Sequence, residues 1–458
     1  MNRILAIAAL TLRSAVRSRL AVLLLVLLLA SVFGLPLAVR GDGTAEGLVQ
    51  VIIAYSLGFA GVLSALAAVW TGCAAISSEI AGRQIHLMVT KPVHPAELWL
   101  GKWLGLLALN LAMVWTSGAA VYGLLRWQTR PERIGDTEYR RLKEEFFVSR
   151  TVLPPLEPDI TEEVNARIRE TIQSGDVPDS DVEQLRIELR RQALAAQRLI
   201  PAGGRRDFVF RLPRTLESDR RMHLSVRLLK SALDFESIQG RWIVGTPDTP
   251  RIAAMEVSIP PISKQSFTLP ELPMTPGEEI RIGFENLDPA GNAVLFDPEG
   301  GLELLVWRGG LEGNMARALW VWFGQLAFVS AVGLSAGALF SMPVASFAAL
   351  TLVALIRMGG FISRVSEEGA IFFSLDQATP TQALLERSLR GFFHVLQGLL
   401  GPLQTPDFLA DLSTGRRISP HTLWGAVGVQ GLLYSGALAL LMLPLFRRRE
   451  LGLPQEGL

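Results

Sequence analysis

Six long segments of this 458-residue chain contain almost no charged residues. A helix needs about 20 apolar residues to cross the hydrocarbon core of a bilayer, which is about 30 Å thick. Charged residues make up only 19% of the chain, whereas soluble domains average about 25%. We therefore expect an α-helical polytopic membrane protein with six transmembrane helices, three within residues 20–125 and three within 317–446. The predicted spans are residues 20–39, 48–76, 98–125, 318–340, 343–363 and 422–446.

Residues 1–19 combine basic side chains, such as Arg3 and Arg13, with apolar ones, such as Leu5 and Leu12. This mixture predicts an amphipathic helix that lies on the cytoplasmic membrane surface. A plain cytoplasmic start to the first span is the simpler alternative. The following apolar run is longer than the roughly 7–15 residues of a signal peptide, so we expect a retained span.

Basic residues near the span ends indicate the orientation, because cytoplasmic loops are enriched in lysine and arginine. They occur before the first span, between the second and third spans (Arg83 and Lys91), and in the tail 447–458. An even number of spans places all three regions, and both termini, in the cytoplasm. The chain has one cysteine and no N-x-[ST] site, which fits a multi-pass protein of the bacterial plasma (inner) membrane.

The segment between the third and fourth spans is expected outside the cytoplasm, as an α+β insert. Residues 126–205 read as helical, and residues 206–316 show short alternating runs separated by Pro, Gly, Asp and Asn, which predicts a β-sandwich-like domain. Trp242 and Trp307 lie in these runs. A strand tryptophan belongs to the core more often than to a sugar- or peptide-binding platform. The predicted strands are 208–212, 223–229, 241–246, 256–260, 279–286 and 302–308.

The loop between the second and third spans carries the most informative motif. Residues 77–91 predict a short helix with apolar members such as Ile80 and Leu87, ended by Pro92 and Pro95. A compact cytoplasmic helix held by two spans is suited to dock a soluble motor and move the spans. A solvated loop is the simpler alternative.

The sequence of this loop resembles the coupling-helix region of type-2 ABC exporter permeases, and is closest to the class linked to multicopper enzyme maturation. The C-terminal run LMLPLFRRREL is also similar to that class. The resemblance covers the membrane part, about half of the chain, and the insert is larger than is usual in that class. The matching positions are Ser78, Glu79, Gly82, Leu87, Lys91, Pro92, Val93, Glu97, Gly101 and Lys102.

The resemblance implies a permease subunit that couples ATP hydrolysis to export, or to mechanical work on an extracytoplasmic substrate. No G-x-x-x-x-G-K-[ST] motif occurs, so the chain is expected to be non-catalytic and without a cofactor, with ATP and Mg bound by a separate ABC ATPase subunit. The implied partners are a second copy or a paired permease, membrane lipid, and an extracytoplasmic protein or glycan. A net charge of +1 gives no case for nucleic acid. The implied ATPase-coupling residues are Ser78, Glu79, Gly82, Arg83, His86, Leu87, Lys91 and Pro92.

Residues 333–337 match the G-x-S-x-G hydrolase motif. The motif lies inside a predicted span, where Gly333 and Gly337 are better explained by close helix packing than by an intramembrane serine protease centred on Ser335. Arg357 is an ionisable residue inside a span, which marks a possible gating or substrate residue. Snorkelling to the interface is the alternative. No residues indicate a metal site.

The outer loop 364–421 contains an amphipathic stretch, Ala383–Leu400, which we expect on the outer interface or in the outer mouth of the bundle. Two other functions remain open on the sequence alone. The first is a membrane-anchored extracytoplasmic binding module without transport, although six spans exceed what an anchor needs. The second is the intramembrane serine protease.

Overall fold

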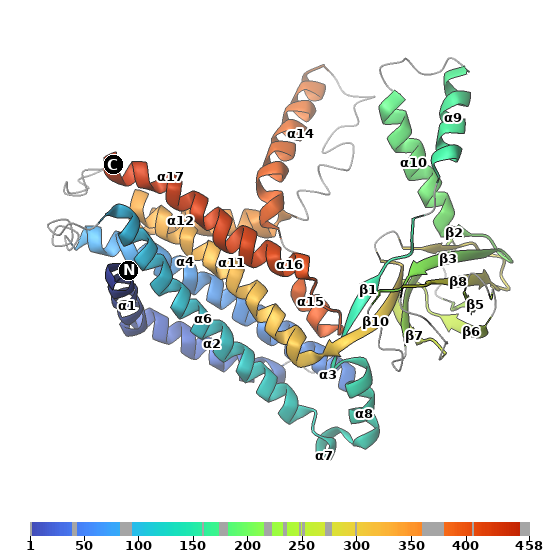
Figure 1. Ribbon diagram of the computed structural model, residues 1–458, viewed down its shortest axis with the longest axis horizontal. Helices are drawn as coiled ribbons and strands as arrows, with labels where there is room; N and C mark the ends of the chain where they lie inside the picture. The colour runs from blue at the N-terminus through green and yellow to red at the C-terminus, as the bar shows by residue number, and fades with distance from the viewer. Residues whose placement is uncertain are drawn as a thin grey trace. The chain divides into compact units, whose positions relative to one another are not determined.

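The computed structural model forms two compact units, Met1–Val148 with Gly310–Leu458, and Ser149–Gly309. The first unit is helical, and the second is rich in β-strand (Figure 1). The residues that the structure describes are 2–38, 44–82, 94–157, 160–173, 182–214, 222–231, 236–246, 249, 252–270, 277–297, 300–359, 380–404 and 407–448.

The first unit is a bundle of long apolar helices with shorter helices at their ends (Figure 1). Its elements are α1 (Asn2–Arg17), α2 (Arg19–Ala38), α3 (Ala45–Val51), the π-helix η1 (Ile52–Leu57), α4 (Gly58–Ala81), α6 (Pro95–Gln128), α7 (Pro131–Ile134), α8 (Asp136–Glu145), α11 (Leu311–Leu339), α12 (Met342–Arg357), α14 (Pro380–Leu400), the 3-10 helix η4 (Gly401–Leu403), α15 (Phe408–Ser413), α16 (Pro420–Trp424), the π-helix η5 (Gly425–Tyr434) and α17 (Ser435–Arg448).

Four helical stretches within the described residues are long and apolar enough to cross a membrane. A bent pair, Arg3–Arg17 with Val22–Gly34, would make a fifth, although its two helices meet at 64°. The predicted span at 343–363 corresponds to α12, which has only 16 residues and so measures about 24 Å. The four stretches are Gly47–Ala81, Pro95–Gln128, Leu311–Leu339 and Pro420–Leu445.

Helix α11 is the centre of the bundle, with 89% of its most apolar stretch buried. It packs against α4, α6, α12, η5 and α17. Gly333 and Gly337, the two small residues noted in the sequence, lie against the backbone of α4. A Cβ added to Gly333 would lie 2.9 Å from the Val69 carbonyl oxygen, and one added to Gly72 would lie 3.0 Å from that of Ser330. Glycine is therefore required on both helices at this crossing.

The predicted separate helix over 77–91 is wrong at its beginning, because Ser77–Ala81 are the last residues of α4. The Ser77 hydroxyl donates to the Cys73 carbonyl at 2.7 Å, and that of Ser78 donates to the Ala74 carbonyl. These serines therefore continue the helix, which ends at Gly82. Residues 83–93 lie outside the described residues.

Within the described residues, the second unit contains two antiparallel sheets and two helices, α9 (Thr161–Gln173) and α10 (Val182–Arg198). One sheet has the order β1-β10-β4-β9-β2 with β7 beside β4, and the other has the order β3-β8-β5-β6. The strands are β1 (Val148–Leu153), β2 (Leu199–Ile200), β3 (Arg205–Arg211), β4 (His223–Lys230), β5 (Ile238–Gly245), β6 (Ala253–Ile259), β7 (Lys264–Thr268), β8 (Glu279–Asn286), β9 (Val294–Phe296) and β10 (Leu302–Gly310).

The two sheets share one hydrophobic core, as a sandwich requires. Trp242 of β5 is fully buried there, with its ring centroid 4.7 Å from that of Phe284 on β8 and 6.2 Å from that of Phe296 on β9 of the other sheet. Trp242 is thus a core residue and not part of an exposed binding platform.

Each of the six predicted strands overlaps an observed one, whereas β1, β2, β7 and β9 were not predicted. Strands β2 and β9 have two and three residues, too few for an alternating pattern to show. Strand β1 lies in the segment 126–205 that we expected to be helical. That expectation is wrong over Val148–Leu153.

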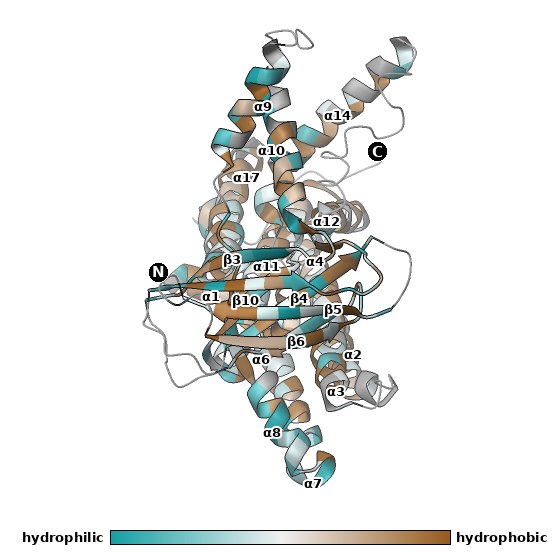
Figure 2. Cartoon of the chain, turned by 90° about the vertical axis from the view of Figure 1, so that its right-hand side faces the viewer, coloured by the Kyte–Doolittle hydropathy of each residue, from teal (hydrophilic) through white to brown (hydrophobic). Residues whose placement is uncertain are grey.

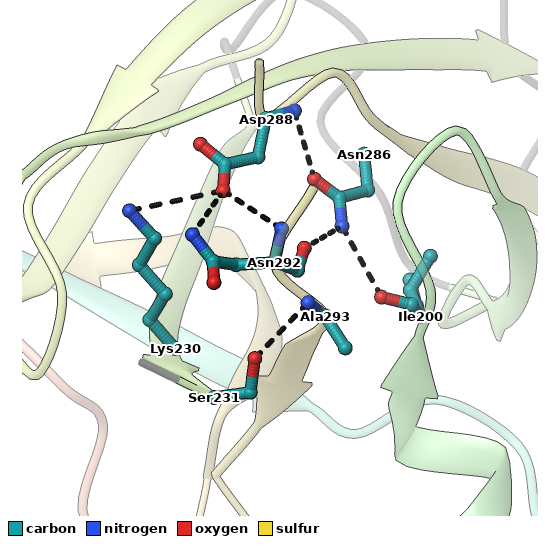
Figure 3. A network of polar contacts seen from close by, with 7 residues as sticks. All are labelled: Ile200, Lys230, Ser231, Asn286, Asp288, Asn292 and Ala293. Carbon is teal, nitrogen blue, oxygen red and sulfur yellow. Dashed lines mark hydrogen bonds and ion pairs between the residues drawn. The ribbon is translucent and has the colours of Figure 1, made fainter. Parts of the chain in front are cut away.

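A buried polar network fixes the turn between β8 and β9 (Figure 3). Asn286 donates to the carbonyls of Ile200 and Asn292. One carboxylate oxygen of Asp288 accepts from the backbone and side chain of Asn292, and lies 3.7 Å from Lys230 Nζ. These groups partner one another, so the network holds the loop in place.

The outer face of the four-stranded sheet carries a row of alternating charges, Arg205, Glu285, Arg241 and Glu256, on four neighbouring strands. Arg241 donates to Glu256 at 2.7 Å and to Glu285 at 3.2 Å. The hydrogen bond that Arg241 donates to Glu256 is the main cause of the raised pKa of Arg241. Helices α8 and α9 also carry polar residues, which are coloured teal in Figure 2.

Candidate functional site

The candidate site lies where α4 ends and α6 begins, on either side of residues 83–93. Helix α6 has a well-defined start, because the His94 ring accepts from the Ala96 N–H and the Glu97 carboxylate accepts from the His94 N–H. These two bonds form a capping box. Pro95 follows the cap as the first helical residue, a position that proline favours. The helix boundary is therefore fixed by local sequence.

An ion pair between Glu79 and Lys102 joins the two helices at this site. Lys102 Nζ lies 2.6 Å from Glu79 Oε1 and also donates to the Ala75 carbonyl at 2.7 Å. The Lys102 side chain is only 3% exposed and that of Glu79 is 22% exposed. Removing one partner of such a buried pair leaves the other charge uncompensated, which costs about 3–5 kcal/mol. The pair therefore connects the end of α4 to the beginning of α6.

The carboxylate of Glu79 has remaining hydrogen-bonding capacity. Among the described residues, its second oxygen, Oε2, is buried and has no hydrogen-bond partner, and the same holds for the indole N–H of Trp99 on α6. Buried polar atoms are nearly always hydrogen-bonded. Glu79 Oε2, in the last turn of α4, and the Trp99 N–H, in the first turns of α6, are therefore two unsatisfied polar atoms of the site.

Stacked indoles connect the ion pair to the centre of the bundle. The ring centroids of Trp99 and Trp103 lie 5.7 Å apart at an interplanar angle of 26°. The Trp103 N–H donates at 3.0 Å to the carbonyl of Ala327 on α11. Both indoles belong to an apolar cluster with Ile76 of α4 and Leu334 of α11. Trp103 and this cluster therefore link the beginning of α6 to α11.

The N-terminal helix α1 packs along α6 at the same end of that helix. A Cβ added to Gly101 would lie 2.7 Å from Ile7 Cβ, and one added to Gly105 would lie 2.6 Å from the Ala8 carbonyl oxygen. These two glycines allow backbone-to-backbone approach. Helix α1 therefore forms part of the site as a packed helix, with Leu5 and Val16 left exposed beside its packed face.

The structure brings together some of the predicted ATPase-coupling residues and leaves others undescribed. Ser78, Glu79 and Gly82 lie at the end of α4. The sequence pattern included Lys102 but not its pairing with Glu79, and Trp99 and Trp103 were not singled out. A lysine within an apolar helix was the available signal for the pair. The predicted residues outside the described part are Arg83, His86, Leu87, Lys91 and Pro92.

The hydrolase-like motif lies within a helix and not at the turn that the hydrolase fold requires. Ser335 lies inside α11 and is 4% exposed, whereas the hydrolase motif requires a sharp strand-to-helix turn. Within the described residues, no group of three His, Cys, Asp or Glu side chains is placed to hold a metal ion. Arg357, the predicted gating or substrate residue, is the last residue of α12 and donates to Gln325 of α11 at 3.0 Å.

Comparisons with protein families, with curated proteins and with solved structures found no match to this chain.

Proposed function

We propose that this chain is the membrane-spanning permease subunit of an ABC transporter, of the type-2 exporter kind, and that a separate ATPase subunit docks on the segment between α4 and α6. The observation that supports this proposal best is the buried Glu79–Lys102 pair. It belongs to the two helices that flank the segment resembling a coupling helix. A transporter needs such a connection between α4 and α6, because the force applied to the segment must reach both helices.

The helical unit supplies the membrane part of the proposed subunit. Four helical stretches of the described residues are long and apolar enough to span a bilayer, and we assign α2 and α12 as the remaining two crossings. The 20 residues of α2 measure about 30 Å. In this assignment both termini and the α4–α6 segment face the cytoplasm of a bacterial cell, and the β-rich unit lies outside it.

The contacts suggest how motion would travel. An ATPase that closes on ATP would displace the docked segment. The Glu79–Lys102 pair would move α4 and α6 together, and Trp103 would pass the movement to α11 through the Ala327 carbonyl. Helix α11 contacts most of the bundle, so its displacement would change the packing of the whole membrane part.

The β-rich unit is the proposed extracytoplasmic contact for a protein or glycan, with the charge row on its four-stranded sheet as the recognition surface. The chain would act with a second copy or with a paired permease, and membrane lipid would surround the bundle. The output is then either export of a substrate or mechanical work on a partner outside the cell.

The test is recovery of an ABC ATPase with the tagged protein from gently solubilised native membranes, identified by mass spectrometry. A variant with Glu79→Arg and Gly82→Arg is compared with the control Glu312→Arg, which changes an exposed acid of the same unit. We expect the ATPase with the wild type and the control and its loss from the double variant. Absence of any ATPase from the wild type would contradict the proposal and favour the binding-module alternative.

A further inference from the structure

Two arginines lie close to each other near the beginning of α11 without an acidic partner. Arg317 is six residues from Leu311, the first residue of that helix. Among the described residues, Arg417 is the charged group that acts on Arg317, and it repels it. Neither arginine makes a hydrogen bond or an ion pair with the part of the chain that the structure describes. Two cations placed together cost free energy, which an anion between them would offset.

Backbone contacts hold the two arginines at this place. The Asn314 side chain of α11 donates to the Arg416 carbonyl at 2.6 Å and accepts from the Ile418 N–H at 2.9 Å. Arg417 is the residue between these two contacts. Asn314 is buried, and residues three apart lie on the same face of a helix, so Arg317 lies about one turn further along that face. The proximity of the two arginines therefore follows from the packing of the chain.

Both arginines are accessible to a molecule outside the protein. Each residue is partly exposed, and each carries five N–H donors. The Nε of Arg417 is buried and has no hydrogen-bond partner among the described residues, although buried polar atoms are nearly always bonded. Glu312, the acid in the first turn of α11, is already paired with Arg126. The two arginines thus have free donors and an uncompensated charge, which suit an anion.

An apolar groove of about 500 Å³ lies next to the arginines, between α6 and α11. Trp320 lines it and follows Arg317 by three residues, so it lies about 4.5 Å further along the same side of α11. Its ring meets that of Trp115 on α6 edge to face, with the centroids 6.3 Å apart. Figure 1 shows α11 between α6, which lines the groove, and the α15–α16 segment, which carries Arg417. The groove is lined by Ala108, Leu111, Ala112, Trp115 and Trp320.

Exposed tryptophans indicate where this face meets the membrane surface. Trp320 is 39% exposed and Trp127, near the end of α6, is 44% exposed, and tryptophan is enriched at the boundary between membrane and water. In the proposed assignment α11 begins outside the cytoplasm. Arg317 then lies at the level of the headgroups, and the groove lies deeper, at the level of the acyl chains. A phospholipid presents a phosphate at the first level and an apolar chain at the second.

We propose that Arg317 and Arg417 bind the phosphate of one anionic phospholipid of the outer leaflet, and that an acyl chain of this lipid lies in the groove. Arginine binds phosphate oxygens through paired, charge-assisted hydrogen bonds, and an apolar groove beside it selects a lipid over free phosphate. This inference rests on the proposed membrane location of the helical unit. It assigns the permease a specific lipid site, in addition to the lipid that surrounds any membrane protein.

The test is native mass spectrometry of the delipidated, detergent-solubilised full-length protein, titrated with phosphatidylglycerol or with phosphatidylcholine of the same acyl chains. We expect the anionic lipid to bind about tenfold more tightly or better, and the double change Arg317→Gln with Arg417→Gln to remove most of that preference. Ala112→Trp, which fills the groove, should weaken binding of both lipids. Two controls change exposed residues away from the site and should leave binding unchanged, Arg211→Gln in the β-rich unit and Val62→Trp on α4.

Three results would overturn the proposal. They are equal binding of the two lipids by the wild type, an unchanged preference for phosphatidylglycerol in the double arginine variant, and unchanged binding of both lipids in Ala112→Trp. Thermal unfolding of each variant checks that it is folded. Lipid binding is measured on the purified chain without an ATPase, so a failure here and a failure to recover the ATPase from native membranes are separate results.

Discussion

Helix α6 carries an ion pair near each end, and the two pairs differ in almost every respect. Near its start, Lys102 pairs with Glu79 of α4 and both groups are largely buried, whereas near its end Arg126 pairs with Glu312 of α11 and the two side chains are 39% and 55% exposed. The Arg126 guanidinium also lies over the rings of Tyr122 and Phe147, 5.3 Å from each ring centroid. An exposed pair contributes about 0–1 kcal/mol, whereas removing one partner of a buried pair leaves the other charge uncompensated and costs about 3–5 kcal/mol. The comparison suggests that the contact between the end of α4 and the beginning of α6, which we call the α4–α6 joint, is the more strongly constrained of the two.

The largest expected difference between the two ends comes from removing one cation at a time. Lys102→Met leaves the Glu79 carboxylate buried without its counter-ion and should destabilise the protein by about 3–5 kcal/mol. Arg126→Met, the matched change at the exposed pair, should cost about 1 kcal/mol or less. Thermal denaturation of the two detergent-solubilised variants compares their losses of stability.

A double variant tests whether the loss of stability in Lys102→Met comes from the unpaired Glu79 charge. Glu79→Leu combined with Lys102→Met removes both charges and should recover most of the lost stability, because no unpaired charge remains. Equal stability of Lys102→Met and Arg126→Met would show that the two pairs do not differ as we describe.

A smaller effect is expected from replacing a glycine of α6 against which α1 packs closely. Gly105→Leu would push into the Ala8 carbonyl and the Thr11 side chain, and overpacking of this kind costs about 1–3 kcal/mol. Gly123→Leu is the matched control on the same helix, since a Cβ there meets nothing within 4 Å. Protease sensitivity of α1 should rise in Gly105→Leu only. A similar rise in the control would indicate a general effect of leucine on α6.

The smallest effect is expected at the indole that connects the joint to α11. Trp103→Phe keeps the stacking on Trp99 but removes the hydrogen bond to Ala327, which should cost about 0.5–1.5 kcal/mol. Trp115→Phe changes an indole that is 40% exposed and serves as the control. Denaturation midpoints measure both, and a larger loss in Trp115→Phe would contradict the assigned role of Trp103.

Much of the helical unit could be predicted from the sequence, because apolar runs longer than a helix needs to cross a bilayer leave few alternatives. The pair Gly333 and Gly337 also suggested a close crossing, although not that Gly72 and Cys73 of α4 would lie opposite. The end of α12 at Arg357 could not be predicted, since the apolar run continues for several residues beyond it.

The joint itself was only partly predictable. Glu79 and Lys102 were both recognised as members of a pattern, but they are 23 residues apart, and their contact depends on how α4 and α6 pack. In the β-rich unit, alternation revealed the long strands β4 and β8, whereas β9 is too short to carry a pattern and is defined by its pairing with β4. Contacts between distant segments are thus what the sequence left open.

The most direct test of the central claim is photo-crosslinking from the segment between α4 and α6 in native membranes. A photoreactive amino acid replaces Leu87 in one variant and Arg130, beyond the opposite end of α6, in the control. We predict a crosslink from position 87 to a protein that carries a nucleotide-binding P-loop, and none to that protein from position 130. Crosslinks from position 87 that never include such a protein would contradict the account.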